Sequence, residues 1–168
     1  MKRLLAIFLV LGTCLTAGAQ DIDGLLEAVR SKRISFNYSY TIEGKVPVIY
    51  KGNVLMQHGC YYATGGGLRI WCDSLSRWTS DETNRELYIE TAGESTDFFA
   101  NAEYYLEGVY DLQFGKDSFK GKYADPQTGV QADFVISDIL FFPSAEDITP
   151  FVFDESSLDS SWVVTDLR

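Results

Sequence analysis

The chain has 168 residues, with 24 acidic side chains against 14 basic ones and a single histidine. A formal net charge of −10 argues against nucleic acid as a partner, because phosphates require a basic footprint. One histidine and three cysteines are poor material for a zinc site or a histidine-based triad. We therefore expect a non-enzymatic protein without metal or cofactor, whose 46% hydrophobic content supports one folded domain.

The first 19 residues have the layout of a secretory signal peptide. Lys2 and Arg3 precede a short apolar run, and small residues at 17–19 form a cleavage site after Ala19. The run is shorter than the roughly 20 residues that a spanning helix needs. Cleavage before Cys14, which would give a lipid-anchored protein, is the less favoured alternative because a threonine precedes that cysteine. We expect residues 20–168 to form a single exported domain.

Periodicity then predicts a helix followed by a meander of antiparallel strands. Apolar residues at 22, 25, 26 and 29 recur at helical spacing, which predicts a helix over 23–32. Next comes a period of two, typical of a strand with one buried face. Its alternating residues are Ile34, Phe36, Tyr38, Tyr40 and Ile42. Further strands are predicted at 50–57, 77–80 and 86–90.

Two cysteines flank a hairpin whose tip is expected at the glycines 65–67. A tight hairpin centred on Gly66 would place Cys60 opposite Cys72, with Cα atoms about 4.5 Å apart, within reach of a disulfide. Export to an oxidising compartment favours this bond, so we expect a Cys60–Cys72 disulfide. The alternative is two buried free thiols, which pack as small hydrophobes.

The rest of the chain is expected to add a second helix and further strands. Phe98, Phe99 and the apolar residues after them predict a helix over 96–106. Residues 104–114 also fit a strand, and that choice stays open. Strands are expected near 118–124 and 130–142. A meander that faces one or two helices defines an α+β fold.

The polar residues form no catalytic constellation. His58 lies beside Gly59 in an expected turn, without a nucleophile or a second metal ligand nearby. Acidic residues such as Asp73 and Asp81 suit turns, and their spacing fits no calcium loop. The notable feature is one aromatic and apolar face of a sheet. It is either plain core or the lining of a site for a greasy ligand, and periodicity does not separate the two.

Four motifs on consecutive strands resemble the LolA-like periplasmic lipoprotein carriers. They are Tyr-Lys-Gly-Asn-Val-Leu-Met at 50–56, Cys-Tyr-Tyr-Ala at 60–63, Ile-Trp-Cys-Asp-Ser-Leu-Ser-Arg-Trp-Thr at 70–79 and Glu-Leu-Tyr-Ile at 86–89. Within them, Asp73, Trp78, Glu86 and Ile89 occupy places that match the family's pattern. The segments 151–154 and 164–168 also resemble the endings of such carriers from Bacteroidetes-type bacteria.

The resemblance implies an incomplete, strongly curved antiparallel β-barrel with helices covering its apolar concave face. It also implies a carrier for lipoprotein acyl chains or another lipid, moving between an inner-membrane lipoprotein exporter and an outer-membrane acceptor. The helix over 96–106 would be its lid. Candidate cavity residues are Phe36, Tyr38, Tyr40, Val54, Met56, Tyr62, Ile70, Trp78, Phe98 and Phe99. The alternative is an envelope interaction or structural module with the same fold and no bound lipid.

Overall fold

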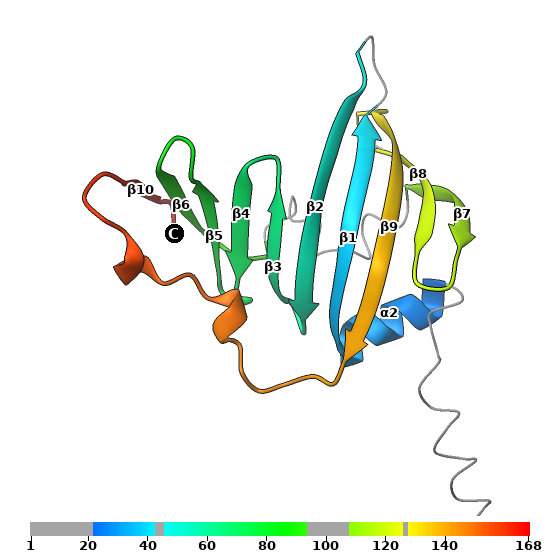
Figure 1. The fold of residues 1–168 in the computed structure, drawn as a ribbon, viewed down its shortest axis with the longest axis horizontal. Coiled ribbons are helices and arrows are strands. Elements are labelled where there is room, and N and C mark those ends of the chain that lie inside the picture. The colour runs from blue at the N-terminus through cyan, green and yellow to red at the C-terminus, as the bar shows by residue number, and fades with distance from the viewer. Residues whose placement is uncertain (1–21, 43–45, 94–107, 126–127) are drawn as a thin grey trace, which may run out of the picture.

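The computed structural model describes residues 22–42, 46–93, 108–125 and 128–168. One helix, α2 (Ile22–Ser31), precedes ten strands that belong to a single sheet (Figure 1). The strands are β1 (Arg33–Ile42), β2 (Val48–Gln57), β3 (Cys60–Gly65), β4 (Leu68–Cys72), β5 (Ser76–Asp81), β6 (Glu86–Thr91), β7 (Val109–Phe114), β8 (Phe119–Ala124), β9 (Gln131–Phe142) and β10 (Val163–Asp166). Two single-turn 3₁₀ helices, η1 (Thr149–Phe151) and η2 (Glu155–Ser157), lie between β9 and β10.

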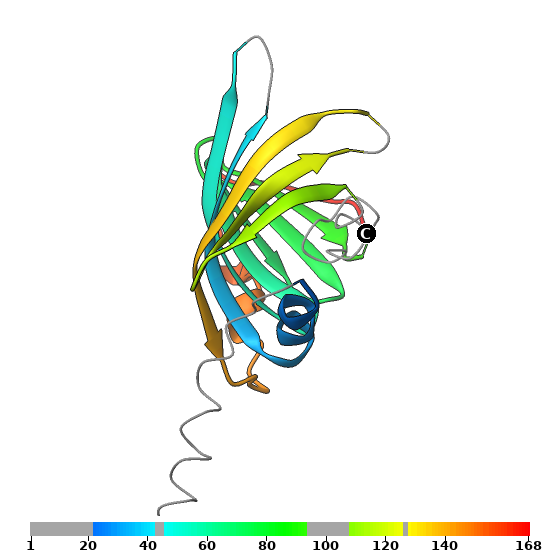
Figure 2. The same cartoon turned by 90° about the vertical axis from the view of Figure 1, so that its right-hand side faces the viewer.

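The sheet runs in the order β10-β6-β5-β4-β3-β2-β1-β9-β8-β7 and does not close. Strands β1 to β6 form a meander, and β9 pairs with the free side of β1, so that β7, β8 and β9 extend the sheet in the other direction. All pairs are antiparallel except β10, which lies parallel to β6. The sheet is strongly curved, with α2 on its concave side (Figure 2).

This architecture corrects the expected fold class. The described part of the chain is 57% strand and 10% helix, so the α+β prediction, with helices covering a face, is wrong. The segment whose state was open supplies β7 from Val109 onward. The helix predicted over 96–106 lies outside the described residues. The helix predicted at 23–32 is present as α2, whose Ala28 and Val29 pack against the buried cluster that contains Ile34 of β1 and Met56 of β2.

Two hairpins with two-residue loops decide which side chains share a face. Residues 58 and 59 join β2 to β3, residues 66 and 67 join β3 to β4, and all four have positive φ. Positive φ at both central positions defines the type I′ turn, whose twist matches that of the flanking strands. The resulting registers pair Met56 with Tyr61, and Tyr61 with Cys72.

The same register corrects the expected disulfide. Because the hairpin centre falls between residues 66 and 67, Tyr61 lies opposite Cys72, and Cys60 belongs to the other face of β3. Both cysteines are buried free thiols, which is the alternative that the sequence left open. The Cys72 thiol donates a weak hydrogen bond to the Gly59 carbonyl at 3.9 Å. Burial raises the pKa of the Cys60 thiol, which keeps it protonated at neutral pH.

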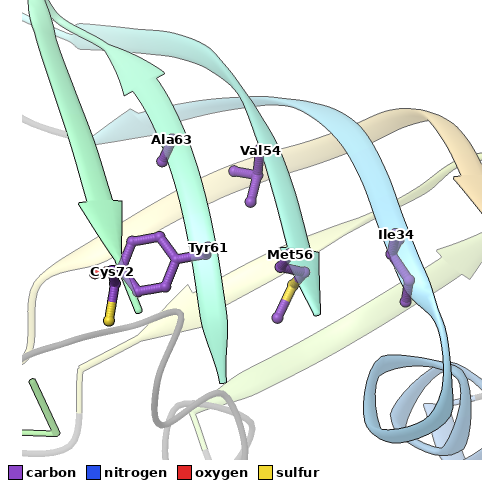
Figure 3. Close-up of a cluster of buried hydrophobic side chains, with 6 residues drawn as sticks. All are labelled: Ile34, Val54, Met56, Tyr61, Ala63 and Cys72. Atoms are coloured by element: carbon purple, nitrogen blue, oxygen red, sulfur yellow. The ribbon is translucent and has the colours of Figure 1, made fainter. Parts of the chain in front are cut away.

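Buried clusters lie on both faces of the sheet. We call the face that bears Ile34, against which α2 packs, the inner face, and the opposite one the outer face. The inner cluster consists of Ile34, Val54, Met56, Tyr61, Ala63 and Cys72 (Figure 3). The outer cluster consists of Trp78, Leu87 and Ile89, packed against Trp71, Phe153, Leu158 and Trp162. Each large side chain that is fully buried contributes about 1.5–3 kcal/mol to stability.

Residues 143–162, which we call the strap, carry the chain from β9 to the far edge and cover the outer cluster (Figure 1). Its anchor is Gln57, which is only 2% exposed. The Gln57 amide donates to the Ala145 carbonyl at 2.6 Å and accepts from the Ala145 N–H at 2.9 Å and from Arg33 Nε at 3.0 Å. Farther along, the Trp78 indole donates to the Glu155 carboxylate at 3.0 Å. These hydrogen bonds replace the ones to water that the amide and the indole give up when they are buried.

Candidate functional site

The inner face presents apolar or glycine residues over seven neighbouring strands, from β7 to β4. The strand registers align these residues in rows that cross the sheet. One row consists of Gly121, Phe134, Tyr40 and Tyr50. The next consists of Phe119, Ile136, Tyr38, Gly52, Gly65 and Leu68. With neighbouring strands about 4.8 Å apart, seven strands extend roughly 29 Å along the sheet, enough for an extended hydrocarbon chain.

Phenylalanines line the end of the inner face that lies on β7, β8 and β9. The Phe114 and Phe119 rings lie 5.8 Å apart, and Phe119 meets Phe134 edge-on at 6.0 Å. Gly121 is on β8, the middle strand of the three, and a Cβ atom there would come within 2.9 Å of Phe134 and 3.0 Å of Leu112. Because Gly121 has no side chain, Phe134 and Leu112 can pack directly over the sheet at this position.

Three tyrosines stack in the middle of the inner face, and we call them the tyrosine stack: Tyr38, Tyr40 and Tyr50. The Tyr38 and Tyr40 ring centroids are 6.1 Å apart, those of Tyr40 and Tyr50 are 4.8 Å apart, and each pair is inclined by 17°. Tyr40 and Tyr50 are cross-strand partners on β1 and β2, whereas Tyr38 is two residues from Tyr40 on β1. Such offset aromatic contacts add to the stability that burial alone provides.

Two glycines hold Tyr38 flat against the sheet. Gly52 and Gly65 are cross-strand partners on β2 and β3, and the Tyr38 side chain lies over both. A Cβ atom at Gly65 would lie 2.1 Å from the Tyr38 hydroxyl oxygen, so only glycine leaves room for that ring. The Tyr38 hydroxyl then donates to the Thr64 carbonyl at 3.1 Å. The position of the first ring in the stack is therefore fixed by packing and by a hydrogen bond.

Burial affects the protonation of two tyrosines of the stack. It raises the pKa of Tyr38, and it raises the pKa of Tyr40, to which the neighbouring Tyr38 and Tyr50 phenols also contribute. Tyr38 and Tyr40 therefore stay neutral at physiological pH, and their hydroxyl groups can donate as well as accept hydrogen bonds.

The inner face becomes polar on β5 and β6. Arg77 and Glu90 are cross-strand partners and form a half-buried ion pair at 2.5 Å. The Tyr88 hydroxyl donates to the Glu86 carboxylate at 2.9 Å, which raises the pKa of Tyr88. Asp81 pairs with Glu86 across the strands. The inner face thus changes from apolar to acidic between β4 and β5.

The structure brings most of the expected cavity residues together, and it separates two of them. Phe36, Tyr38, Tyr40, Val54, Met56 and Ile70 share the inner face. Tyr62 and Trp78 are on the outer face, where both are cross-strand partners of Trp71, so their assignment to the cavity is wrong. Phe98 and Phe99 lie outside the described residues.

Sequence reasoning missed Tyr50 and the inner-face residues of β7, β8 and β9. The signal for β9 was present, because Phe134 and Ile136 alternate with polar or exposed residues. Nothing in a periodic pattern says which strand a new strand will pair with, so the proximity of Phe134 to Tyr40 could not be predicted. Tyr50 could have been found, because it lies two residues from Gly52 on a predicted strand.

Among the described residues, no group of three or more histidine, cysteine, aspartate or glutamate side chains is placed to hold a metal ion. His58 is exposed in the β2–β3 turn. No helix within the described ranges has the length and apolar character to cross a membrane.

No protein-family model and no curated protein sequence matches this chain. The resemblance to the LolA-like carriers therefore stays a prediction from the sequence motifs.

Proposed function

We propose that this protein binds the acyl chain of a lipid or lipoprotein on its inner face and carries it through the periplasm toward the outer membrane. The observation that supports this function is the unbroken apolar surface from β7 to β4, on which several side chains are only half-buried. Tyr50 is 37% exposed and Val48 is 45% exposed. A contiguous apolar surface of this kind favours an apolar ligand, because each methylene group removed from water contributes about 0.8 kcal/mol.

The two faces of β1 show that the apolar character belongs to the inner face. The outer-face residues of β1 between Arg33 and Ile42 are Ser35, Asn37, Ser39 and Thr41. Small polar side chains of this kind suit a surface in contact with water. The inner-face residues of the same strand are all aromatic or aliphatic. An acyl chain laid across β1 would therefore meet a surface suited to it on one face only.

The test uses two neighbouring residues of β2 that point to opposite faces. Val48 is on the inner face, and Ile49, which is 60% exposed, is on the outer face. We expect Val48→Glu to weaken binding of the hydrocarbon dye diphenylhexatriene by at least about tenfold, because a carboxylate cannot lie against an acyl chain without losing hydration. Ile49→Glu is the matched control and should bind as wild type does.

Native mass spectrometry of the purified protein, before and after mild solvent extraction, identifies a natural ligand. We expect an extractable mass in the lipid range for wild type and a smaller bound fraction for Val48→Glu. Equal dye binding by wild type and both variants, together with a bare protein mass, would contradict the proposal.

A second candidate function is an envelope interaction module without lipid. The observation that favours it is a set of exposed apolar residues on the outer face of β9: Val135, Leu140 and Phe142. The test is cross-linking in cells. A protein adduct that Leu140→Glu removes and Val48→Glu leaves intact would support this second function, and an adduct indifferent to both changes would count against it.

A further inference from the structure

We propose that the hydroxyl groups of Tyr40 and Tyr50 form a hydrogen-bonding site for the uncharged ester of an acylglycerol, beside the apolar surface that takes its acyl chain. This inference rests on the proposed lipid binding and names the class of lipid that the inner face selects. A fatty-acyl ester of glycerol occurs in free acylglycerols and in the lipid anchor of lipoproteins. The two tyrosine hydroxyls would bind this shared group in either source.

First, these two hydroxyls have no hydrogen-bond partner among the residues that the structure describes. Tyr38 donates to the Thr64 carbonyl, whereas for Tyr40 and Tyr50 the described part of the chain offers no hydrogen-bond partner. A phenol hydroxyl can donate one hydrogen bond and accept others. A ligand that covers the apolar rings would displace water from these hydroxyls, so the ligand must supply an acceptor to avoid a desolvation penalty. An ester carbonyl supplies that acceptor.

The second argument is that the hydroxyls are held in place before a ligand arrives. Tyr40 stacks on Tyr50 at 4.8 Å and on Tyr38 at 6.1 Å, and Phe134 is its cross-strand partner on β9. Tyr38 is itself fixed over the glycine pair on β2 and β3. A ligand group that binds such a rigid stack loses less free energy to ordering of side chains.

The third argument is the charge of the inner face. On the described inner-face strand positions, Asp81, Glu86 and Glu90 provide three carboxylates, and Arg77 provides one guanidinium, which is already paired with Glu90. Asp81 and Glu86 belong to the row next to that of Tyr40 and Tyr50. Carboxylates at this end of the sheet disfavour a fatty-acid carboxylate or an anionic headgroup placed toward β5 and β6, whereas a neutral ester carries no charge for them to repel.

The test compares a hydrocarbon, a neutral ester and an acid on the full chain. Diphenylhexatriene reports the apolar surface, and monomyristoylglycerol and myristate compete with it. We expect monomyristoylglycerol to bind more tightly than myristate. Tyr40→Phe and Tyr50→Phe should each weaken monomyristoylglycerol binding about fivefold, and the double variant roughly 25-fold, whereas diphenylhexatriene, which has no ester to bind, should lose affinity by a clearly smaller factor. Tyr110→Phe, which removes a 39% exposed outer-face phenol, is the control.

The outcomes separate this inference from the function on which it rests. A Tyr40→Phe/Tyr50→Phe variant that binds monomyristoylglycerol as tightly as wild type overturns the inference and leaves lipid binding intact. Failure of wild type to bind either diphenylhexatriene or monomyristoylglycerol overturns the proposed function. A diacylglyceryl-cysteine peptide is the third competitor. A larger loss for the peptide in the double variant supports a lipoprotein anchor as the source of the ester, and a larger loss for monomyristoylglycerol supports a free acylglycerol.

Discussion

The glycine pair under Tyr38 gives the sharpest test of how the inner face is built. A Cβ atom added at Gly65 would lie 2.1 Å from the Tyr38 hydroxyl oxygen and 3.1 Å from the Lys51 carbonyl. The Tyr38 side chain must then move and lose its hydrogen bond to the Thr64 carbonyl. The lost bond costs about 1 kcal/mol and the crowding costs about 1 kcal/mol more. We expect Gly65→Ala to lower the free energy of unfolding by about 2 kcal/mol.

Gly52→Ala should destabilise the fold for a different reason, and the size of this loss should not depend on the Tyr38 hydroxyl. Its Cβ atom would lie 1.6 Å from the backbone carbonyl oxygen of Thr64, so β2 and β3 would have to separate. We expect a loss of about 3 kcal/mol, at the upper end of the usual cost of overpacking. The Cβ atom would also lie 2.7 Å from Cε1 of Tyr38, but phenylalanine keeps that ring atom, so Tyr38→Phe should relieve neither contact.

A double-mutant cycle in urea, followed by circular dichroism, separates the two causes. In a Tyr38→Phe background the oxygen that obstructs Gly65→Ala is gone, so its cost should fall below about 1 kcal/mol. Gly52→Ala should keep its full cost in that background. If Gly65→Ala costs the same with and without the Tyr38 hydroxyl, then that hydroxyl does not occupy the space over Gly65, and the account of the tyrosine stack is wrong.

Three further outcomes follow from the contacts of the sheet. Gln57→Ala removes two hydrogen bonds to the strap and one from Arg33, and it should cost about 3 kcal/mol in urea unfolding. The exposed Asn53→Ala on the same strand should cost under about 0.5 kcal/mol. Because Cys60 and Cys72 are buried free thiols, iodoacetamide should label both in urea and neither in buffer. Hydrogen bonds from the Arg168 guanidinium and backbone lower the pKa of Asp166 from 3.8 to about 2. This carboxylate therefore stabilises the fold above about pH 4, and the contribution is lost as pH falls toward 2. In Asp166→Asn the free energy of unfolding should depend less on pH across that window.

The sequence was sufficient to predict where most strands lie, but it was insufficient to predict which of their side chains share a face. The alternation of β1 and the helical spacing of α2 are local properties, and both elements lie within a residue or so of their predicted bounds. The predicted faces of Tyr62 and Trp78 were wrong because the face of a residue on a later strand depends on the length of every loop that precedes that strand. Each loop residue more or less turns every later side chain to the opposite face. The positive φ of residues 58 and 59, which settles the matter for β3, is not encoded by a His-Gly pair alone.

The last third of the chain was harder for a different reason. The pairing of β9 with β1 joins residues about a hundred positions apart, and the β-bulges in β9 and β7 add residues that shift the alternation. Asp138 and Asp111 adopt positive φ at these bulges. The Asp138 carboxylate accepts from the Asn37 amide at 2.8 Å, which ties the bulge to β1. The strap and the parallel strand β10 carry no periodic signal, and sequence reasoning did not anticipate their position on the outer face.

The two buried clusters explain why an open, curved sheet of this size has different surfaces at its two ends. From β7 to β4 the inner face is apolar, and over β4 to β6 the outer face is apolar and covered by the strap. Where the outer face of β5 buries Trp78, its inner face bears Arg77. The apolar side of the sheet therefore changes at β4, and the inner face has a fixed boundary there between apolar and acidic residues. An amphiphile bound along the inner face would be oriented by this boundary, with its hydrocarbon toward β7 to β9 and its polar group toward the tyrosine stack and β5.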